Sequence, residues 1–366
     1  MAYPTLNPNE VQSVFHNMII SIEMLGFKND DSYRSLVSRA KVDGSLYGDT
    51  KVFRPVVITR TTPFTGYSEA SHLLELEYQK QPAEQVITLD VFRKIVLTSD
   101  KILSKRAFTD AGVFGEYISI LDATVRQTKD IYDETTFNAY IGTHKSAVQP
   151  TCQINVTAAV GSATGEEANR LKAQAIARGI ADLAVKMKNV NRVYNDLGII
   201  RKNNMKDLVV VWNSDYVNEI TKFDLPTIFH KDGLLEIKEE NILPSTYFGT
   251  VNTAATAGDG STVRALVELE FNTVAPQNPA YNPAKHVFAG ELVPTGETAP
   301  AGASYTVDST IIAKVMDIKS VPFMSSFEVA SDFFNPLSQT TNKILIWGHN
   351  TLDYIKEKPF FDIVEI

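Results

Sequence analysis

The sequence predicts an α+β fold, because strand-like and helix-like stretches both occur along the chain. Apolar residues alternate with polar ones from Ile87 to Leu97, which is the pattern of a half-buried strand. A helical spacing of apolar residues follows and predicts a helix over residues 111–139, a rod of about 44 Å at 1.5 Å per residue. The apolar, β-branched run from Leu208 to Trp212 predicts a strand that is buried on both faces.

The composition excludes several classes of protein. The chain has 366 residues, with 35 Lys and Arg against 43 Asp and Glu, and a net charge of −8. Its one cysteine, Cys152, can form no disulfide within the chain and no thiolate zinc site, which indicates a reducing compartment. No signal peptide and no apolar run of about 18 residues occurs, so we expect a soluble protein of two to three compact units without membrane contact.

The first element is an amphipathic helix over residues 7–26. Asn7 is its predicted N-cap, Pro8 occupies the first turn, and Gly26 ends it. One face carries the apolar residues Val11, Val14, Phe15, Met18, Ile19, Ile22 and Leu25. Such a terminal helix must lay this stripe on the rest of the chain or on a neighbouring molecule. A short helical stretch follows around Tyr33, Leu36 and Val37.

A projecting two-stranded loop is predicted next. Strand-like runs at 51–60 and 73–78 flank a turn at 61–66. Five charged residues lie on it, namely Arg54, Arg60, Glu75, Glu77 and Lys80. An isolated hairpin is marginally stable in water at best, so we expect the loop to rest on another surface.

Residues that cap helices or interrupt strands predict where the next elements begin and end. Ser99 and Asp100 are expected to end the strand that begins at Ile87. A short strand is predicted through Cys152, Ile154 and Val156. The segment from Thr164 to Glu167 matches a capping box that opens a helix, and Ser214 is expected to cap another.

The last third of the chain is rich in strands and loops. Residues 249–309 contain one alternating strand, at 263–271, among Gly, Pro, Ala and Asn, which indicates a β-rich insertion. Three further strands are predicted, at 311–318, 327–330 and 343–347, and the chain ends in the segment 359–366.

No catalytic, cofactor or metal site is predicted. The sequence contains neither a G-x-G-x-x-G nor a G-x-x-x-x-G-K-[ST] phosphate loop, and no G-x-S-x-G turn. The six histidines are too far apart in sequence to form a local ligand set. Cys152 lies in an alternating strand, where a buried structural thiol is the favoured interpretation.

The order of these elements resembles a known family. A terminal helix, a projecting loop, and a strand that leads to a long helix ending Phe137-Asn138-Ala139-Tyr140-Ile141-Gly142 precede the strand at 208–213. This order, with the segments Leu97-Thr98-Ser99-Asp100 and Val210-Val211-Trp212-Asn213-Ser214, is similar to the major capsid protein of tailed bacteriophages, in its lambdoid-head fold and a short-tailed-phage branch. The resemblance covers nearly the whole chain apart from roughly 250–309.

The resemblance implies a division of the chain. Residues 1–50 would be an N-terminal arm across neighbouring subunits, and 51–85 an extended loop over the next subunit. Residues 86–160 would form the peripheral domain with its spine helix. Residues 161–309 would form the axial domain, with the β-rich insertion near 250–309, and residues 310–366 would return to close the peripheral and axial sheets.

The resemblance also implies a function without enzymatic chemistry. The chain would form hexamers and pentamers of an icosahedral shell around double-stranded DNA, assembled in the bacterial cytoplasm. Its partners would be other copies, a portal protein, separate scaffolding or decoration proteins, and packaged DNA bound non-specifically. The implied contact residues are Val11, Phe15, Met18 and Ile22 on the arm and Arg54, Arg60, Glu75, Glu77 and Lys80 on the loop.

Two alternatives remain open on the sequence. The first is the shell of a bacterial nanocompartment with the same fold, whose inner wall binds cargo enzymes instead of enclosing a genome. The second is a soluble α+β enzyme whose site is assembled from residues distant in sequence. Such an enzyme would be a monomer or small oligomer with a deep pocket.

Overall fold

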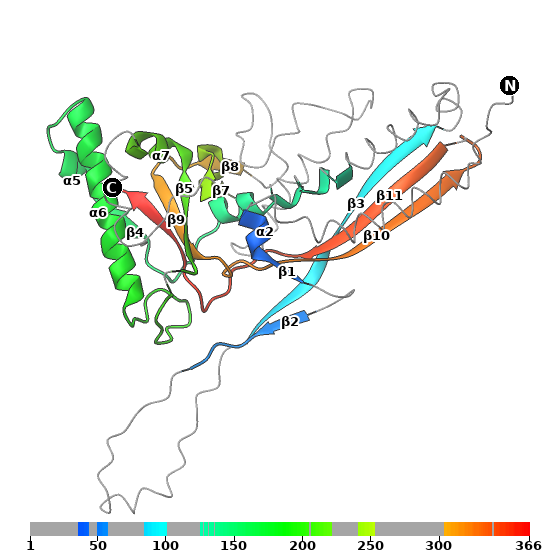
Figure 1. The fold of residues 1–366 in the computed structure, drawn as a ribbon, viewed down its shortest axis with the longest axis horizontal. Helices are drawn as coiled ribbons and strands as arrows, with labels where there is room; N and C mark the ends of the chain where they lie inside the picture. The colour runs from blue at the N-terminus through cyan, green and yellow to red at the C-terminus, as the bar shows by residue number, and fades with distance from the viewer. Residues whose placement is uncertain are drawn as a thin grey trace, which may run out of the picture.

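The computed structural model describes residues 36–43, 50–57, 84–100, 125–126, 128–130, 132–134, 136–204, 206–221, 241–252, 304–338 and 340–366. These residues form two five-stranded sheets that lie at opposite ends of the molecule, with helices packed beside them (Figure 1). The mixture of helices and strands confirms the α+β prediction.

The long sheet contains five strands in the order β1-β10-β11-β3-β2. Their bounds are β1 Lys41–Asp43, β2 Thr50–Phe53, β3 Gln85–Asp100, β10 Phe323–Asn335 and β11 Thr340–Asn350. The strands β10, β11 and β3 are antiparallel and form the extended ribbon in Figure 1. Ile87, Leu89 and Val91 are buried while the residues between them are exposed, as the alternating sequence predicts.

Four strands of the long sheet have bounds that differ from the prediction. β3 continues through Ser99 and Asp100, because these residues pair with Thr341 and Thr340 of β11. β10 and β11 are longer than the predicted segments at 327–330 and 343–347, since each supplies the other with backbone partners. β2 ends at Phe53 instead of continuing to residue 60, and it pairs with β3.

The compact sheet has the order β4-β12-β9-β5-β6. Its strands are β4 Cys152–Ile154, β5 Leu208–Asn213, β6 Ile242–Leu243, β9 Ile311–Asp317 and β12 Phe360–Glu365. Every residue of β5 is buried, which confirms the prediction of a strand covered on both faces. The remaining strands, β7 Gly249–Asn252 and β8 Ser304–Val307, form a separate pair.

The described helices are α2 Leu36–Ala40, α5 Val156–Val160, α6 Glu166–Lys188 and α7 Ser214–Thr221, with a 3-10 turn, η3, at Ser245–Tyr247. The described residues from 125 to 143 are also helical, and we call this segment the spine helix. It packs on the long sheet through Tyr132, whose ring meets Trp347 edge-on at 5.7 Å, and through Phe137, whose ring lies 6.3 Å from Phe323. None of the described helices has the length and apolar character needed to cross a membrane.

Two hydrophobic cores lie on opposite faces of the compact sheet. The first core contains Val209 and Val211 of β5 together with the spine helix, α2 and Trp347. The second core contains Val210 and Trp212 of β5 together with the buried side of α6. Because successive side chains of a strand point to opposite faces, the compact sheet forms a wall shared by both cores.

Helix α6 lies very close to the compact sheet. A side-chain carbon added at Gly179 would stand 2.8 Å from the side chain of Ile154 in β4, so a larger residue there would require Ile154 to move. The predicted capping box is wrong. The helix is preceded by Gly165, whose φ of 64° favours glycine, and no side chain caps it.

Two further boundaries correct the sequence analysis. Val156 begins helix α5 instead of continuing a strand, because Asn155 Oδ1 accepts a hydrogen bond from Ala158 N at 2.8 Å. Ser214 is the first residue of α7, and the preceding Asn213 accepts from Asp215 N at 3.1 Å. Ser214 Oγ instead accepts from Ser245 N, at the start of η3.

Several predicted elements lie outside the described residues. They are the helix at 7–26, the turn at 61–66, the strand at 73–78, residues 111–124 of the long helix, and the strand at 263–271.

Candidate assembly surface and the joint between the sheets

Arg54 is the one predicted contact residue that falls within the described part of the chain. Its Nε lies 2.8 Å from Glu84 Oε1, and the two side chains are 65% and 50% exposed. Residues 55–83 lie between them in the chain, so the ion pair joins the two ends of the predicted projecting loop. An exposed pair of this kind contributes about 1 kcal/mol or less to stability. Val11, Phe15, Met18, Ile22, Arg60, Glu75, Glu77 and Lys80 lie outside the described residues.

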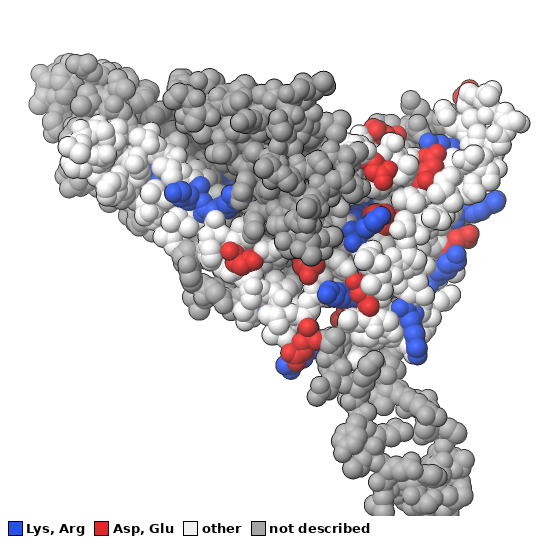
Figure 2. Space-filling model, turned by 180° about the vertical axis from the view of Figure 1, so that it is seen from behind, with Lys and Arg blue, Asp and Glu red and all other residues white. Residues whose placement is uncertain are grey.

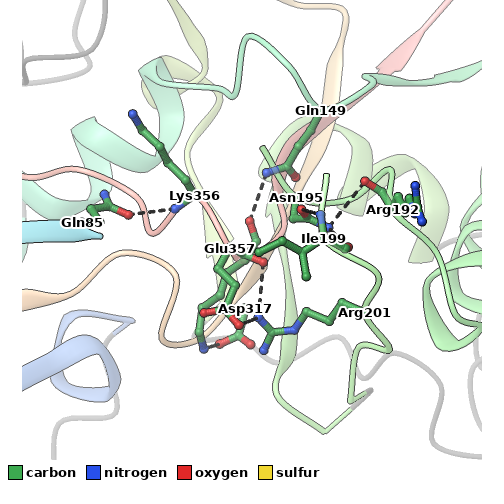
Figure 3. A network of polar contacts seen from close by, with 10 residues as sticks. Gln85, Gln149, Arg192, Asn195, Ile199, Arg201, Asp317, Lys356 and Glu357 are labelled. Atoms are coloured by element: carbon green, nitrogen blue, oxygen red, sulfur yellow. Dashed lines mark hydrogen bonds and ion pairs between the residues drawn. The ribbon is translucent and has the colours of Figure 1, made fainter. Parts of the chain in front are cut away.

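A second feature is the crossover segment, residues 351–359, which leads from β11 in the long sheet to β12 in the compact sheet. Leu352 and Ile355 are buried within it. Polar side chains from several distant segments bind the rest of the crossover, as Figure 3 shows. This segment and its partners form the joint between the two sheets.

Gln85 holds the crossover from the long sheet. It is the first residue of β3 and follows the Arg54–Glu84 pair directly. Its Nε2 donates to the Tyr354 carbonyl oxygen at 2.8 Å and lies 3.4 Å from Asp353 Oδ2. Its Oε1 accepts from Lys356 N at 3.0 Å, as Figure 3 shows. One side-chain amide therefore connects the base of the predicted loop to the joint.

Gln149 and Asp196 hold the opposite side of the crossover. Gln149 Nε2 donates to Asp196 Oδ1 at 2.8 Å and to the Lys358 carbonyl oxygen at 3.0 Å, and its Oε1 accepts from Phe360 N at 2.9 Å. Asp196 also accepts from Ser146 Oγ at 2.7 Å and from the Tyr354 hydroxyl. Burial and the bond to Asp196 raise the pKa of Tyr354, so this hydroxyl remains a donor.

Two ion pairs complete the joint. Arg201 Nη1 lies 2.5 Å from Glu357 Oε1, and Lys358 Nζ lies 2.7 Å from Asp317 Oδ1 (Figure 3). Asn195 closes the turn before Arg201, because its side chain both donates to and accepts from the backbone of Ile199 at 2.9 Å. Hydrogen bonds and ion pairs thus connect the crossover to both sheets.

A buried polar cluster connects the spine helix to the long sheet. The hydroxyl of Tyr132 accepts from Arg93 Nε at 2.9 Å and lies 3.0 Å from His349 Nε2. His349 Nδ1 lies 2.9 Å from the Asn350 carbonyl oxygen, which can only accept. The proton of the neutral ring is therefore on Nδ1, and Nε2 accepts from Tyr132.

Asp133, the next residue of the spine helix, is a buried carboxyl group without a hydrogen-bond partner at either oxygen. Burial raises its pKa from 3.8 to about 6, although Lys129 and Lys41 favour the charged form. The pKa of this group therefore lies close to neutral pH.

A buried charged pair lies inside the compact sheet. Lys314 of β9 and Asp362 of β12 are opposite one another in register, with 2.8 Å between Nζ and Oδ1. Lys314 also donates to the His144 carbonyl oxygen, and its Nζ lies 4.6 Å from the centre of the Phe360 ring. Burial lowers the pKa of Lys314, while Asp362 opposes this change. The pair satisfies two charges that the fold encloses.

The described residues contain no group of three or more His, Cys, Asp and Glu side chains that could hold a metal ion. Burial raises the pKa of the Cys152 thiol, which lowers the fraction of reactive thiolate. The titratable groups described above take part in packing and in the joint.

Comparison with solved structures identifies the fold. A chain in the capsid structure of Staphylococcus phage Andhra aligns with a TM-score of 0.58 and 12% identity, over 90% of this chain and 83% of that one. The chain has a tailed-phage capsid fold. A chain in the structure of the head fiber and inner core protein gp22 of bacteriophage P68 aligns with a TM-score of 0.52 and 12% identity, over 88% of this chain and 82% of that one. No protein-family model and no curated protein matches the sequence.

The capsid fold confirms the predicted fold class. The residues of the joint, in contrast, could not have been predicted from the sequence. Gln85, Gln149 and Asp196 belong to no sequence motif, and their partners are 47 to 271 residues away in the chain.

Proposed function

We propose that this chain is the major capsid protein of a tailed bacteriophage, and that it assembles into hexamers and pentamers of an icosahedral shell around double-stranded DNA. The observation that supports this function best is the similarity of fold to the Andhra capsid structure over 90% of the chain. The protein then resides in the virion capsid after assembly in the bacterial cytoplasm.

We assign each part of a capsid subunit to a segment of the chain. Residues 1–50 are the arm, 51–85 the extended loop, 86–160 the peripheral domain, 161–309 the axial domain and 310–366 the return strands. Two features support this division. The Arg54–Glu84 pair closes the base of the loop, and the return strands enter both sheets, since β10 and β11 belong to the long sheet and β9 and β12 to the compact sheet.

The proposed work of the chain is self-association rather than catalysis. Its candidate contact residues are those of the arm and the loop: Val11, Phe15, Met18, Ile22, Arg54, Arg60, Glu75, Glu77 and Lys80. A shell of many copies gains its stability from many modest contacts of this kind. The further proposed partners are a portal protein, scaffolding or decoration proteins and packaged DNA.

The direct test is negative-stain microscopy with light scattering on the purified chain, with and without its co-expressed neighbouring genes. Closed shells, tubes or capsomer rings are expected. A stable monomer under every condition would contradict the proposal. Shells that contain enzyme cargo instead of DNA would indicate a nanocompartment.

Deleting residues 1–26 tests the role of the arm. The truncated chain should remain folded, because the described members of both cores lie between Leu36 and Ile363, but it should assemble poorly. Circular dichroism and thermal melting measure the fold, and light scattering measures assembly. Assembly equal to that of the full chain would reject the arm assignment.

A further inference from the structure

The segment from Lys186 to Lys206, which we call the basic segment, carries a local excess of positive charge. Six of its 21 residues are Lys or Arg, against 35 of the 366 in the whole chain, and its only acidic residue is Asp196. It comprises the last turn of α6 and most of the connection to β5. In a chain with a net charge of −8, such a segment is the electrostatic mark of a surface that meets a polyanion.

Five of the six cations are exposed, namely Lys186, Lys188, Arg192, Lys202 and Lys206. None of these five has a carboxylate within ion-pair distance among the residues that the structure describes. The sixth, Arg201, pairs with Glu357 in the joint. Asp196 is also engaged there, since it accepts hydrogen bonds from Gln149 and Ser146. The described fold therefore does not neutralise the exposed charge of the basic segment.

Other charged surfaces of the molecule mix the two signs. Figure 2 shows Lys and Arg side chains interspersed with Asp and Glu over the face that it displays. On α6, Arg170 lies 2.8 Å from Glu167, and Asp182 follows Arg178 by about one turn. Asp207 directly follows the basic segment, is exposed, and offsets only one of its five exposed cations. The unbalanced charge is therefore a specific feature of this segment.

Hydrogen bonds hold the basic segment in place. Asn191 and Arg201 exchange two backbone hydrogen bonds, of 3.0 and 2.9 Å. The side chain of Asn195 binds the backbone of Ile199 twice, at 2.9 Å each. The cations therefore stand on a firm support, which lowers the entropic cost of binding a partner.

The pairing of Asn191 with Arg201 also sets the direction of two cations. Neighbouring residues of paired extended segments point to opposite sides. Because Arg201 points toward Glu357 of the crossover, Lys202 and Arg192 point away from it. Figure 3 shows the Arg192 side chain extending away from the polar contacts of the joint. These two cations therefore project outward.

The groups of the basic segment match the phosphates of a DNA duplex. Phosphate contacts use Lys and Arg side chains and carry no sequence information. A single strand would also be bound by stacking of its bases on exposed aromatic rings. The only aromatic residue of the segment, Tyr194, instead stacks its ring on Phe361, with 5.3 Å between the centroids.

We propose that the basic segment of each copy contacts the phosphates of the enclosed DNA duplex. This inference rests on the proposed shell function and specifies which residues meet one of its proposed partners. It also places this end of the compact sheet on the inner side of the shell. Because the contacts are electrostatic, they weaken steeply with salt and do not select a DNA sequence.

The salt dependence of DNA binding tests the contact. The variant Arg192→Gln with Lys202→Gln removes two charges from the basic segment. The control, Lys94→Gln with Lys356→Gln, removes two charges from exposed positions elsewhere, and Figure 3 shows Lys356 and Arg192 on opposite sides of the joint. Fluorescence anisotropy measures the affinity of the unassembled full chain for a short labelled duplex at several salt concentrations.

The slope of the logarithm of affinity against the logarithm of salt concentration should become less steep by about 1.8 in the variant, since each phosphate contact contributes about 0.9. The control should keep the slope of the unsubstituted chain. Circular dichroism shows whether both variants remain folded.

Lysine acetylation in assembled shells gives a second measurement that needs no substitution. DNA-filled and empty shells of the unsubstituted chain are treated with an acetylating reagent, and mass spectrometry measures the modification of each lysine. Acetylation of Lys186, Lys188, Lys202 and Lys206 should fall several-fold in filled shells. Acetylation of Lys94 should be equal in both.

Three results would overturn the inference. Equal salt slopes for the variant and the control would show that Arg192 and Lys202 do not meet DNA. Basic-segment lysines that react equally in filled and empty shells would reject the contact while leaving the shell function intact. A folded Arg192→Gln, Lys202→Gln chain that fails to assemble but keeps its salt slope would place the segment against an acidic surface of a neighbouring copy. Failure of the unsubstituted chain to assemble under any condition would instead contradict the shell function on which the inference rests.

Discussion

At the scale of single residues, Asp133 is a buried carboxyl group next to Tyr132 of the first core. Its carboxyl group is 2% exposed, and neither oxygen has a hydrogen-bond partner. Desolvation raises its pKa to about 6, with the nearby Asp130 adding to this and Lys129 and Lys41 opposing it. Because the pKa is higher in the folded chain than the ordinary 3.8, folding favours the protonated form. This contribution to stability is present below about pH 4 and is lost as the pH rises through 6.

The substitution Asp133→Asn should therefore stabilise the chain at pH 8. The gain in free energy of unfolding should be up to about 3 kcal/mol, because each pKa unit corresponds to about 1.4 kcal/mol. At pH 4 the gain should vanish, since the native carboxyl is then neutral. Urea denaturation at both pH values measures the difference.

Asp182→Asn is the control, because Asp182 is an exposed residue of α6 and does not contribute to the pKa of Asp133. Its effect should be small at both pH values. If Asp133→Asn lowered stability at pH 8, the carboxylate would have to be held by favourable interactions, and the interpretation of Asp133 as an unsatisfied charge would be wrong.

At the scale of elements, the crossover depends on contacts that no local pattern reveals. Gln85 contributes three polar contacts to residues about 270 positions later in the chain. Replacing it with Ala should leave the Lys356 amide without its acceptor. The loss of one to two hydrogen bonds costs about 1–3 kcal/mol, so hydrogen exchange at Lys356 should accelerate by about tenfold or more.

Hydrogen exchange with mass spectrometry or NMR measures this prediction. Gln153→Ala, at an exposed position of β4, provides the control and should leave exchange in the crossover unchanged. Equal protection of residues 351–359 in both variants would mean that Gln149 and Asp196 hold the crossover without help from the long sheet.

The sequence predicts those elements whose own side chains determine them. β5 was predictable because its apolar run is buried on both faces, and β3 because its alternation matches one buried face. The full length of β10 was not, because polar residues such as Ser325 and Ser326 join the sheet through their partners in β11 and, for Ser325, in β1. Likewise, charged residues beside a predicted loop suggested Arg54 as a contact candidate, whereas Gln85 acquires its role only when the crossover is folded against it.

At the scale of the whole molecule, the compact sheet joins the two hydrophobic cores. Alternate residues of the same strand serve different cores, as Phe360 and Phe361 of β12 do. Unfolding of one core would remove the wall of the other, and each buried side chain of this size contributes about 1.5–3 kcal/mol through burial. Neither core should therefore persist alone.

The chain's two tryptophans allow this coupling to be measured, because Trp347 belongs to the first core and Trp212 to the second. In the variants Trp212→Phe and Trp347→Phe, the remaining tryptophan reports on one core. Fluorescence midpoints in urea should match the midpoint from circular dichroism for each variant, as a single cooperative transition requires. If the Trp212 signal changed at a clearly different urea concentration from the circular dichroism signal, α6 and its core would form a separate unit. The compact sheet would then be a boundary between two folding units and not the element that unites them.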